Sequence, residues 1–136
     1  MTDGLRVVLR AGGRSPVQAR QVVSRWLAAV CGRSAPCDLA DDLVFAVSEA
    51  VTNCVDHAYR DRAPGDIRVE GELSAPAGAP RTVTVAVSDD GAWSEPDQDP
   101  GFRGRGLSMI RASVTSLNLV AGRCGTTLVM TQQLGC

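Results

Sequence analysis

The stretch Thr82–Gly91, TVTVAVSDDG, decides the fold and contains the first candidate functional group. Valine stands at every second position and alternates with threonine, alanine and serine, which is typical of a strand with one buried face. The strand runs directly into Asp89-Asp90-Gly91, so a carboxylate stands where an apolar strand ends. Such a carboxylate can accept hydrogen bonds from an amino group of a ligand, and glycine allows a close approach to the backbone. The same residues are typical of an ordinary Asp-Gly turn, and the motif alone leaves both interpretations open.

The same period of two predicts further strands on both sides of this stretch. Their ranges are 5–9, 67–73, 116–120 and 126–133. Residues 67–73 alternate apolar side chains with arginine and glutamate, which favours an antiparallel partner for the strand at 82–88. The last two ranges are joined through Gly122 and Gly125 and are predicted as a closing hairpin.

Apolar residues at helical spacing predict three helices. The first starts at Ser15-Pro16-Val17-Gln18, with serine as the N-cap, proline in the first turn and glutamine three residues after the cap, and ends near Cys31. The second begins at Asp38 and continues to about Tyr59, and the third follows at 107–114.

Together these elements predict an α+β fold, a two-layer α/β sandwich in which helices cover one face of a mixed, mostly antiparallel sheet. Trp26 and Phe45 on the first two helices are expected in the core. The 136 residues, of 14.3 kDa, fit one domain over 1–136.

Composition and charge exclude several classes of function. The formal net charge of −1 argues against binding nucleic acid over a broad basic face. All 14 basic residues are arginine, which excludes phosphate chemistry that depends on lysine. No apolar run approaches the roughly 20 residues of a membrane span, and Met1–Gly4 does not begin a secretory signal, so a cytoplasmic location is expected. Five cysteines without a CxxC pair, and a single histidine, argue against a zinc site and favour reduced thiols.

On the second predicted helix, Glu49 and Asn53 are four residues apart, so their side chains project from the same side of adjacent turns. Asp42, Asp56 and Arg60 lie on the same polar stripe. A solvated helix face is the simpler explanation of such a stripe taken alone. The motifs that follow Glu49 and Asn53 in the chain favour a functional role for this pair.

Two glycine motifs come after the strand-end carboxylate. Between Asp89 and Arg105 the chain has no periodicity and is rich in Gly, Pro and Asp, which predicts a functional or mobile loop. Gly104-Arg105-Gly106-Leu107 then starts the third helix, where free N–H groups suit a phosphate. Gly125-Thr126-Thr127 starts the last strand, and an ordinary hairpin entry explains it equally well when it is taken alone.

The order and spacing of these motifs resemble one superfamily. Glu49-x-x-x-Asn53, Asp89-x-Gly91, Gly104-x-Gly106 and Gly125-Thr126-Thr127 resemble the N, G1, G2 and G3 boxes of the GHKL ATPases, which have the Bergerat ATP-binding fold. From about Leu5 to Leu134 the chain is similar to the small bacterial anti-sigma-factor serine kinases, and Ser48–Asn53 is close to their helix sequence. The chain departs from the superfamily pattern where Trp93 stands at the second glycine of the G1 box.

The resemblance implies a role for each motif. Asn53 would coordinate a Mg²⁺ that bridges the phosphates of ATP, and Glu49 would be the general base for a Ser or Thr hydroxyl of a protein substrate. Asp89 would accept from the adenine amino group, with Gly91 against the base and Thr126 or Thr127 supporting the carboxylate. Gly104 and Gly106 would lend backbone to the phosphates, with Arg103 or Arg105 as a charge on a lid over about 90–105. Leu107, at the start of the helix, is included among the nucleotide-binding residues.

The function that the resemblance implies is an ATP-dependent protein serine kinase that also acts as an anti-sigma factor. Its implied partners are a sigma factor, an anti-anti-sigma protein with a STAS domain, and a second copy of the chain in a homodimer. Two alternatives stay open: an ATP-binding regulatory module without phosphoryl transfer, and the catalytic domain of a histidine kinase. Retention of both Glu49 and Asn53 favours the kinase over the module, and a histidine kinase would need a phosphoacceptor partner on another chain.

Overall fold

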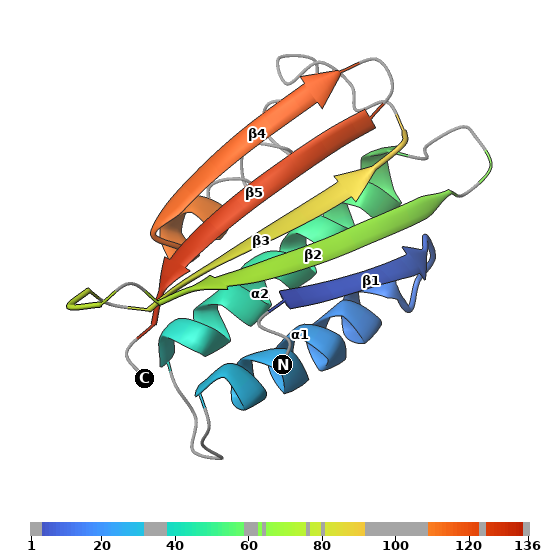
Figure 1. Ribbon diagram of the computed structural model, residues 1–136. Coiled ribbons are helices and arrows are strands. Elements are labelled where there is room, and N and C mark those ends of the chain that lie inside the picture. Colours follow the sequence, from blue (N-terminus) through green and yellow to red (C-terminus); the bar gives the residue numbers. More distant parts are fainter. Residues whose placement is uncertain are drawn as a thin grey trace.

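The computed structural model describes residues 4–31, 38–58, 63, 65–75, 77–79, 81–91, 109–122 and 125–134. It has two layers, an antiparallel five-stranded sheet and a layer of helices on one face of that sheet (Figure 1). The strands are β1 (Gly4–Arg10), β2 (Asp66–Ser74), β3 (Thr82–Asp89), β4 (Ser116–Gly122) and β5 (Gly125–Gln133). The helical layer contains α1 (Ser15–Cys31), α2 (Asp38–Asn53), the π-helical turn η1 (Cys54–Ala58) and a short helix at 109–113. The predicted α+β sandwich is confirmed.

The order of strands in the sheet is β1-β2-β3-β5-β4, and all pairings among these described strands are antiparallel, where a mixed sheet was expected. β3 therefore lies in the middle, between β2 and β5. Side chains alternate between the two faces along β3, and the buried row toward the helices is Val83, Val85, Val87 and Asp89. The carboxylate of Asp89 thus continues an apolar row.

The core lies between the sheet and the helices. α2 packs against β3 and β5, whereas α1 packs against β1 and α2. Leu43, Val47 and Val51 of α2 are fully buried in this core, and each such side chain contributes about 1.5–3 kcal/mol when it is removed from water. This apolar seam holds α2 along the middle of the sheet.

A glycine permits close contact between α1 and the sheet. Trp26 of α1 lies over Gly71 of β2, and a Cβ at residue 71 would come within 2.7 Å of the indole ring. Trp26 is buried, as predicted. Any larger residue at position 71 would push α1 away from β2.

A buried glutamine joins the short helix to the rest of the fold. Gln132 faces the helices from β5 and is 2% exposed. Its Oε1 accepts from the backbone N–H of Thr115 at 2.8 Å and from the Thr115 hydroxyl at 3.0 Å. Its Nε2 donates to the carbonyl oxygens of Leu39 at 2.9 Å and Ser113 at 3.1 Å. This side chain therefore fixes the end of the 109–113 helix and the start of α2 on the same strand.

The start of α1 differs from the prediction. The backbone N–H of Gln18 donates to the carbonyl of Arg14, which makes Arg14 the last residue before the helix and places Ser15 within the first turn. The Ser15 hydroxyl donates to the carbonyl of Arg10 at 2.6 Å and accepts from the N–H of Gly12 at 2.9 Å. Ser15 therefore ties α1 to the end of β1 and does not cap the helix.

Other expectations about α1 and α2 need correction. Phe45 is 39% exposed and does not belong to the core, because it lies on the outer side of α2, between the turns that carry Asp42 and Glu49. α2 ends at Asn53 and continues as η1, and Tyr59 lies outside the described residues. Cys31 was expected to be reduced, but it forms a disulfide whose partner lies outside the described part. A disulfide needs only two suitably placed cysteines and no CxxC motif.

Among the helices that the structure describes, none is long and apolar enough to cross a membrane.

Candidate functional site

Asp89 is the last residue of β3, and its side chain is 2% exposed on the helix-covered side of the sheet. One carboxylate oxygen, Oδ1, accepts a hydrogen bond from the backbone N–H of Gly91 at 3.0 Å. This bond closes an Asx-type turn around Asp90. Gly91 is buried as well. The ordinary turn is therefore present and its carboxylate is buried, while the contact of this carboxylate with a ligand stays a prediction.

Thr126 lies directly opposite Asp89 in the pairing of β3 with β5. Its side chain is 3% exposed, and within the described residues its Oγ1 has no hydrogen-bond partner. Glycine at position 125 lets β5 begin against β3, because a Cβ there would collide with the carbonyl oxygen of Asp89. Thr127 points to the other face, where its hydroxyl donates to Oγ of Ser88 at 3.2 Å. Of the two predicted threonines, only Thr126 shares the face of Asp89.

Cys54 brings η1 into contact with the same carboxylate. It follows Asn53 in the chain, is 1% exposed and belongs to the turn that packs against β3. Its thiol lies close to the Asp89 carboxylate. Burial, and then the charge and hydrogen bond of Asp89, raise the pKa of Cys54 well above its ordinary value. The thiol therefore keeps its proton at neutral pH and remains a donor.

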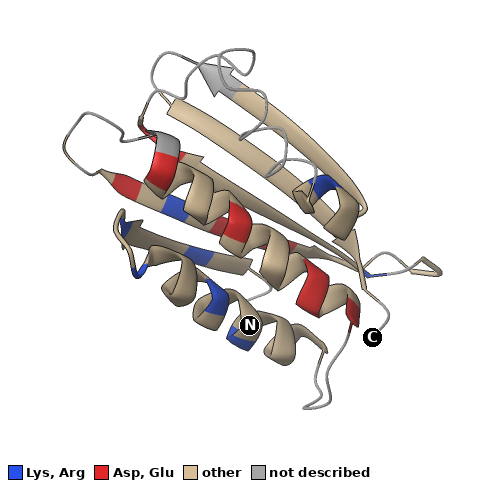
Figure 2. Cartoon of the chain, turned by 180° about the vertical axis from the view of Figure 1, so that it is seen from behind, with Lys and Arg blue, Asp and Glu red and all other residues tan. Residues whose placement is uncertain are grey.

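Glu49 and Asn53, near the end of α2, are both half-buried. Asp42 and Asp56 on the same polar stripe are exposed, which distinguishes the pair from a uniformly solvated face. Acidic residues are spread along α2, whereas α1 contains basic residues (Figure 2). Because Cys54 follows Asn53 and contacts Asp89, the end of α2 meets the end of β3. Two motifs that are 36 residues apart in the sequence thus lie at one end of the molecule.

Asp90 points to the opposite face of the sheet and has a charged partner. Arg68 of β2 donates from Nη1 to Oδ2 at 3.1 Å and from Nη2 to Oδ1 at 2.9 Å. The side chains of Arg68 and Asp90 are 39% and 58% exposed. The hydrogen bond from Arg68, together with its charge, lowers the pKa of Asp90 below its ordinary value.

The other predicted site residues, Arg103, Gly104, Arg105, Gly106 and Leu107, lie outside the described residues, as do Trp93 and most of the expected lid over about 90–105. Sequence reasoning missed Cys54 and Arg68. The position of Cys54 beside Asn53 was a signal that could have pointed to it. Arg68 had no such signal, because its contact with Asp90 depends on the pairing of β2 with β3.

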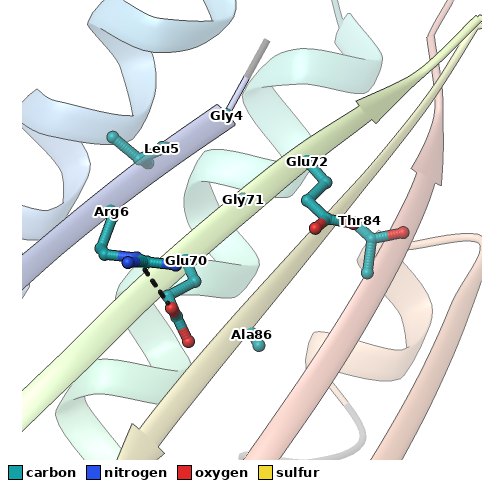
Figure 3. A pocket seen from close by; sticks show the side chains of 8 residues that line it. All are labelled: Gly4, Leu5, Arg6, Glu70, Gly71, Glu72, Thr84 and Ala86. Atoms are coloured by element: carbon teal, nitrogen blue, oxygen red, sulfur yellow. Dashed lines mark ion pairs between the residues drawn. The ribbon is translucent and has the colours of Figure 1, made fainter. Parts of the chain in front are cut away.

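A cavity of ≈ 540 Å³ lies away from this site, on the sheet face opposite the helices (Figure 3). It is lined by Gly4, Leu5, Arg6, Glu70, Gly71, Glu72, Thr84 and Ala86. An ion pair of 3.2 Å between Arg6 Nε and Glu70 Oε2 crosses it. None of the predicted site residues lines this cavity, so it is not the place where the motifs gather.

The chemistry of the groups at the end of β3 fits an adenine nucleotide. A carboxylate can accept from an exocyclic amino group, and the Thr126 hydroxyl can bond to a ligand or to a water beside it. For a metal, the described residues contain no group of three or more His, Cys, Asp or Glu that could hold an ion. Asn53 offers one amide oxygen, which suits Mg²⁺ because this ion takes most of its ligands from phosphates and water.

The antiparallel sheet, its single helical layer and the strand-end carboxylate define a domain with the GHKL ATPase fold. The chain belongs to the Histidine kinase-like ATPase domain family, whose model matches residues 13–132. This match includes α1, α2 and most of β5, and all the motifs quoted from the sequence.

Two curated relatives are anti-sigma F factors from clostridia. The protein of Clostridium beijerinckii is 41% identical over 54 residues, and that of Clostridium novyi is 39% identical over 54 residues. Each match covers 40% of this chain and 34% of the relative. The chain therefore spans about a third of the length of these relatives.

Two solved structures are similar over nearly the whole chain. The crystal structure of the RsbU and RsbW domains of Rv1364c from Mycobacterium tuberculosis has a TM-score of 0.75 and 28% identity, and the match covers 98% of this chain and 33% of that one. The histidine kinase domain of a blue-light activated kinase from Erythrobacter litoralis has a TM-score of 0.54 and 22% identity, with 97% and 68% covered. The second similarity shows the fold alone.

Proposed function

We propose that this chain is an ATP-dependent protein serine kinase that also acts as an anti-sigma factor. Membership of the ATPase family supports ATP as its ligand, and the names of the clostridial relatives support a sigma factor as a partner. The further partners that we propose are an anti-anti-sigma protein with a STAS domain, which carries the acceptor serine, and a second copy of the chain.

One observation carries the nucleotide part of the proposal. At the end of β3, the buried carboxylate of Asp89 lies across from a buried threonine hydroxyl, on Thr126, that has no partner in the described part of the chain. A buried polar group without a partner costs about 1–3 kcal/mol. A ligand that bonds to both groups would recover this cost. The amino group of adenine, with or without an intervening water, has the required chemistry.

In this proposal the residues at the end of β3 select the base. Asp89 accepts from the exocyclic amino group, while the N–H of Gly91 holds the carboxylate in place and the protonated thiol of Cys54 lies beside it. Gly91 leaves room for the base against the backbone. Thr126 provides a second polar group on the same face.

The residues at the end of α2 perform the chemistry. Asn53 would hold Mg²⁺, which supplies charge stabilisation at the phosphates when it is bound. Glu49 takes the proton of the substrate serine hydroxyl while the serine oxygen bonds to the γ-phosphorus. The bond from that phosphorus to the β,γ-bridging oxygen breaks, and ADP leaves. We propose Arg103, Gly104, Arg105, Gly106 and Leu107 as phosphate-contacting residues on the basis of the motif alone.

Calorimetric titration with ATP, with and without Mg²⁺, tests the nucleotide part. We expect binding that Mg²⁺ strengthens, and no binding in either condition would refute the proposal. Incubation with labelled ATP and candidate STAS-domain proteins tests the transfer. Label on serine supports the kinase, binding without transfer indicates a regulatory module, and acid-labile label on histidine indicates a histidine kinase.

A further inference from the structure

The pair Arg68–Asp90 joins β2 to the turn that carries the base-binding carboxylate. Both terminal nitrogens of Arg68 reach the carboxylate of Asp90, at 2.9 and 3.1 Å. A two-point contact between a planar guanidinium and a carboxylate fixes orientation as well as distance. Asp90 is the residue between Asp89 and Gly91, so its position constrains both neighbours.

The strand register explains why Arg68 is the residue that reaches this turn. Arg68 pairs with Ser88, and Ile67 pairs with Asp89. Alternation along the strands therefore puts the side chains of Arg68 and Asp90 on the uncovered face, while Asp89 faces the helices. The turn is thus held from both sides of the sheet, by Arg68 on one face and by the groups around Asp89 on the other.

We propose that Arg68 is a positioning residue for recognition of the nucleotide base, acting through Asp90. Because Arg68 holds the side chain of Asp90, it restricts the backbone conformation between Asp89 and Gly91. That conformation determines the direction of the Asp89 carboxylate. The inference rests on the proposed function, since it assigns to Asp89 the contact with the adenine amino group.

A contribution to global stability does not account for this pair. Both side chains are more than a third exposed, and ion pairs of this kind contribute little to the free energy of unfolding because water and salt screen them. Their effect is local and acts on the geometry of one turn. The chain offers a comparison in Arg6 and Glu70, an exposed ion pair that joins β1 to β2 on the same face. Glu70 pairs with Ala86 of β3, three residues before Asp89.

The test compares Arg68→Gln, Asp90→Asn and the double variant with Arg6→Gln, which removes the same charge at the matched position. Affinities for adenosine, ADP and ATP are measured by NMR titration or calorimetry, and thermal unfolding checks the fold of each variant. We expect Arg68→Gln and Asp90→Asn to weaken binding of all three ligands by the same factor, about three- to fivefold, in line with the strength of an exposed ion pair. The double variant should match the single variants, and Arg6→Gln should match the wild type.

A ligand-free measurement tests the same geometry. The N–H of Gly91 donates to Asp89, so its hydrogen exchange should accelerate in Arg68→Gln and stay unchanged in Arg6→Gln.

Three results would overturn the inference while the proposed function stands: equal effects of Arg68→Gln and Arg6→Gln, a loss confined to ATP with adenosine unaffected, or additive losses in the double variant. The second result would mean that Arg68 acts only as a charge felt by the phosphates. A wild-type protein that binds no adenine compound would instead refute the proposed function, and this inference with it.

Discussion

At the end of β3, two consecutive carboxylates lie on opposite faces of the sheet and differ in burial and in hydrogen-bond partners. On the helix-covered face, Asp89 is 2% exposed, accepts a hydrogen bond from the N–H of Gly91 and lies close to the protonated thiol of Cys54. On the uncovered face, Asp90 is exposed and paired with Arg68. A buried carboxylate is costly in free energy, whereas an exposed ion pair costs little and contributes little. The difference separates the group that we propose selects the ligand from the group that we propose holds the turn.

The helix-covered face also contains the buried polar atoms that lack a partner. Within the described residues these are Oγ1 of Thr126 and Nε1 of Trp26. Thr126 lies opposite Asp89 in the sheet, whereas Trp26 lies over Gly71, in the contact between α1 and β2. Only the threonine is next to the candidate site. The helix-covered face therefore contains both the candidate ligand-binding groups and a buried hydroxyl whose lack of a partner costs free energy. The following predictions test that separation between the two faces.

The largest effect is expected in the helical layer, at the proposed general base. Glu49→Gln keeps nearly the same shape but cannot take a proton, so phosphoryl transfer should fall by about 10²–10⁴. ATP affinity should stay within a few fold of the wild type. Rates measured with labelled ATP and a STAS-domain substrate check this expectation. Transfer at the wild-type rate would remove Glu49 from the mechanism.

Asn53→Ala serves as the contrasting variant for Glu49→Gln. It removes the proposed metal ligand, so binding and transfer should both decline, and the decline in binding should depend on Mg²⁺. A loss of ATP affinity by the same factor with and without Mg²⁺ would contradict this assignment.

The next effect concerns stability and compares adjacent residues of β5. Gln132→Leu leaves the N–H of Thr115 and the carbonyls of Leu39 and Ser113 without their partner. We expect a loss of about 2–4 kcal/mol in the free energy of unfolding, because several buried polar groups lose a bond at once. Denaturant unfolding measures this loss.

Thr131→Val is the matched control for Gln132→Leu. Thr131 faces the uncovered side, where its hydroxyl makes a long contact of 3.4 Å with Thr84. The expected change is within about 0.5 kcal/mol, as for most surface substitutions. Equal losses in both variants would mean that the two faces of β5 do not differ as argued.

The third prediction concerns the selection of the nucleotide base by Asp89. Asp89→Asn keeps the size of the side chain but replaces one acceptor oxygen with a donor, so the contact with the adenine amino group is lost or mispaired. ATP affinity should fall about 10- to 100-fold, the range expected for a hydrogen bond to a charged group. GTP affinity should fall less. Equal losses for the two nucleotides would make Asp89 a structural residue.

Much of the fold was predictable because local patterns determine it. Valines at every second position predict β3 and its buried row of side chains, and Gly125 indicates the start of β5. The identity of Asp89 as a candidate followed from its place at a strand end. These features depend on residues that are neighbours in the sequence, so the sequence alone is enough to detect them.

Features that depend on distant contacts were not predictable. The hydroxyl of Ser15 bonds back to β1, so a cap motif was misassigned. Phe45 was expected in the core because its side chain is large and apolar, yet it lies on the solvent-facing side of α2. The contact between Arg68 and Asp90 requires the register of β2 with β3. The choice between Thr126 and Thr127 likewise required knowing which residue pairs with Asp89.

The smallest effect is expected at Cys54, and it refines the description of the helix-covered face. If the thiol matters as a donor to Asp89, Cys54→Ser should bind ATP within about twofold of the wild type, because the hydroxyl can also donate. Cys54→Ala should bind about three- to fivefold more weakly, the effect of losing one modest hydrogen bond. Serine and alanine leave nearly the same space, so lost packing affects both variants alike, and only the hydrogen-bond donor distinguishes them.

Calorimetry measures the affinities, and thermal unfolding measures the shared packing loss. Because the pKa of Cys54 is raised, the thiol is protonated at neutral pH and the comparison holds there. Equal affinities for the two variants would show that Cys54 only fills space, leaving the N–H of Gly91 as the donor that orients the carboxylate on this face.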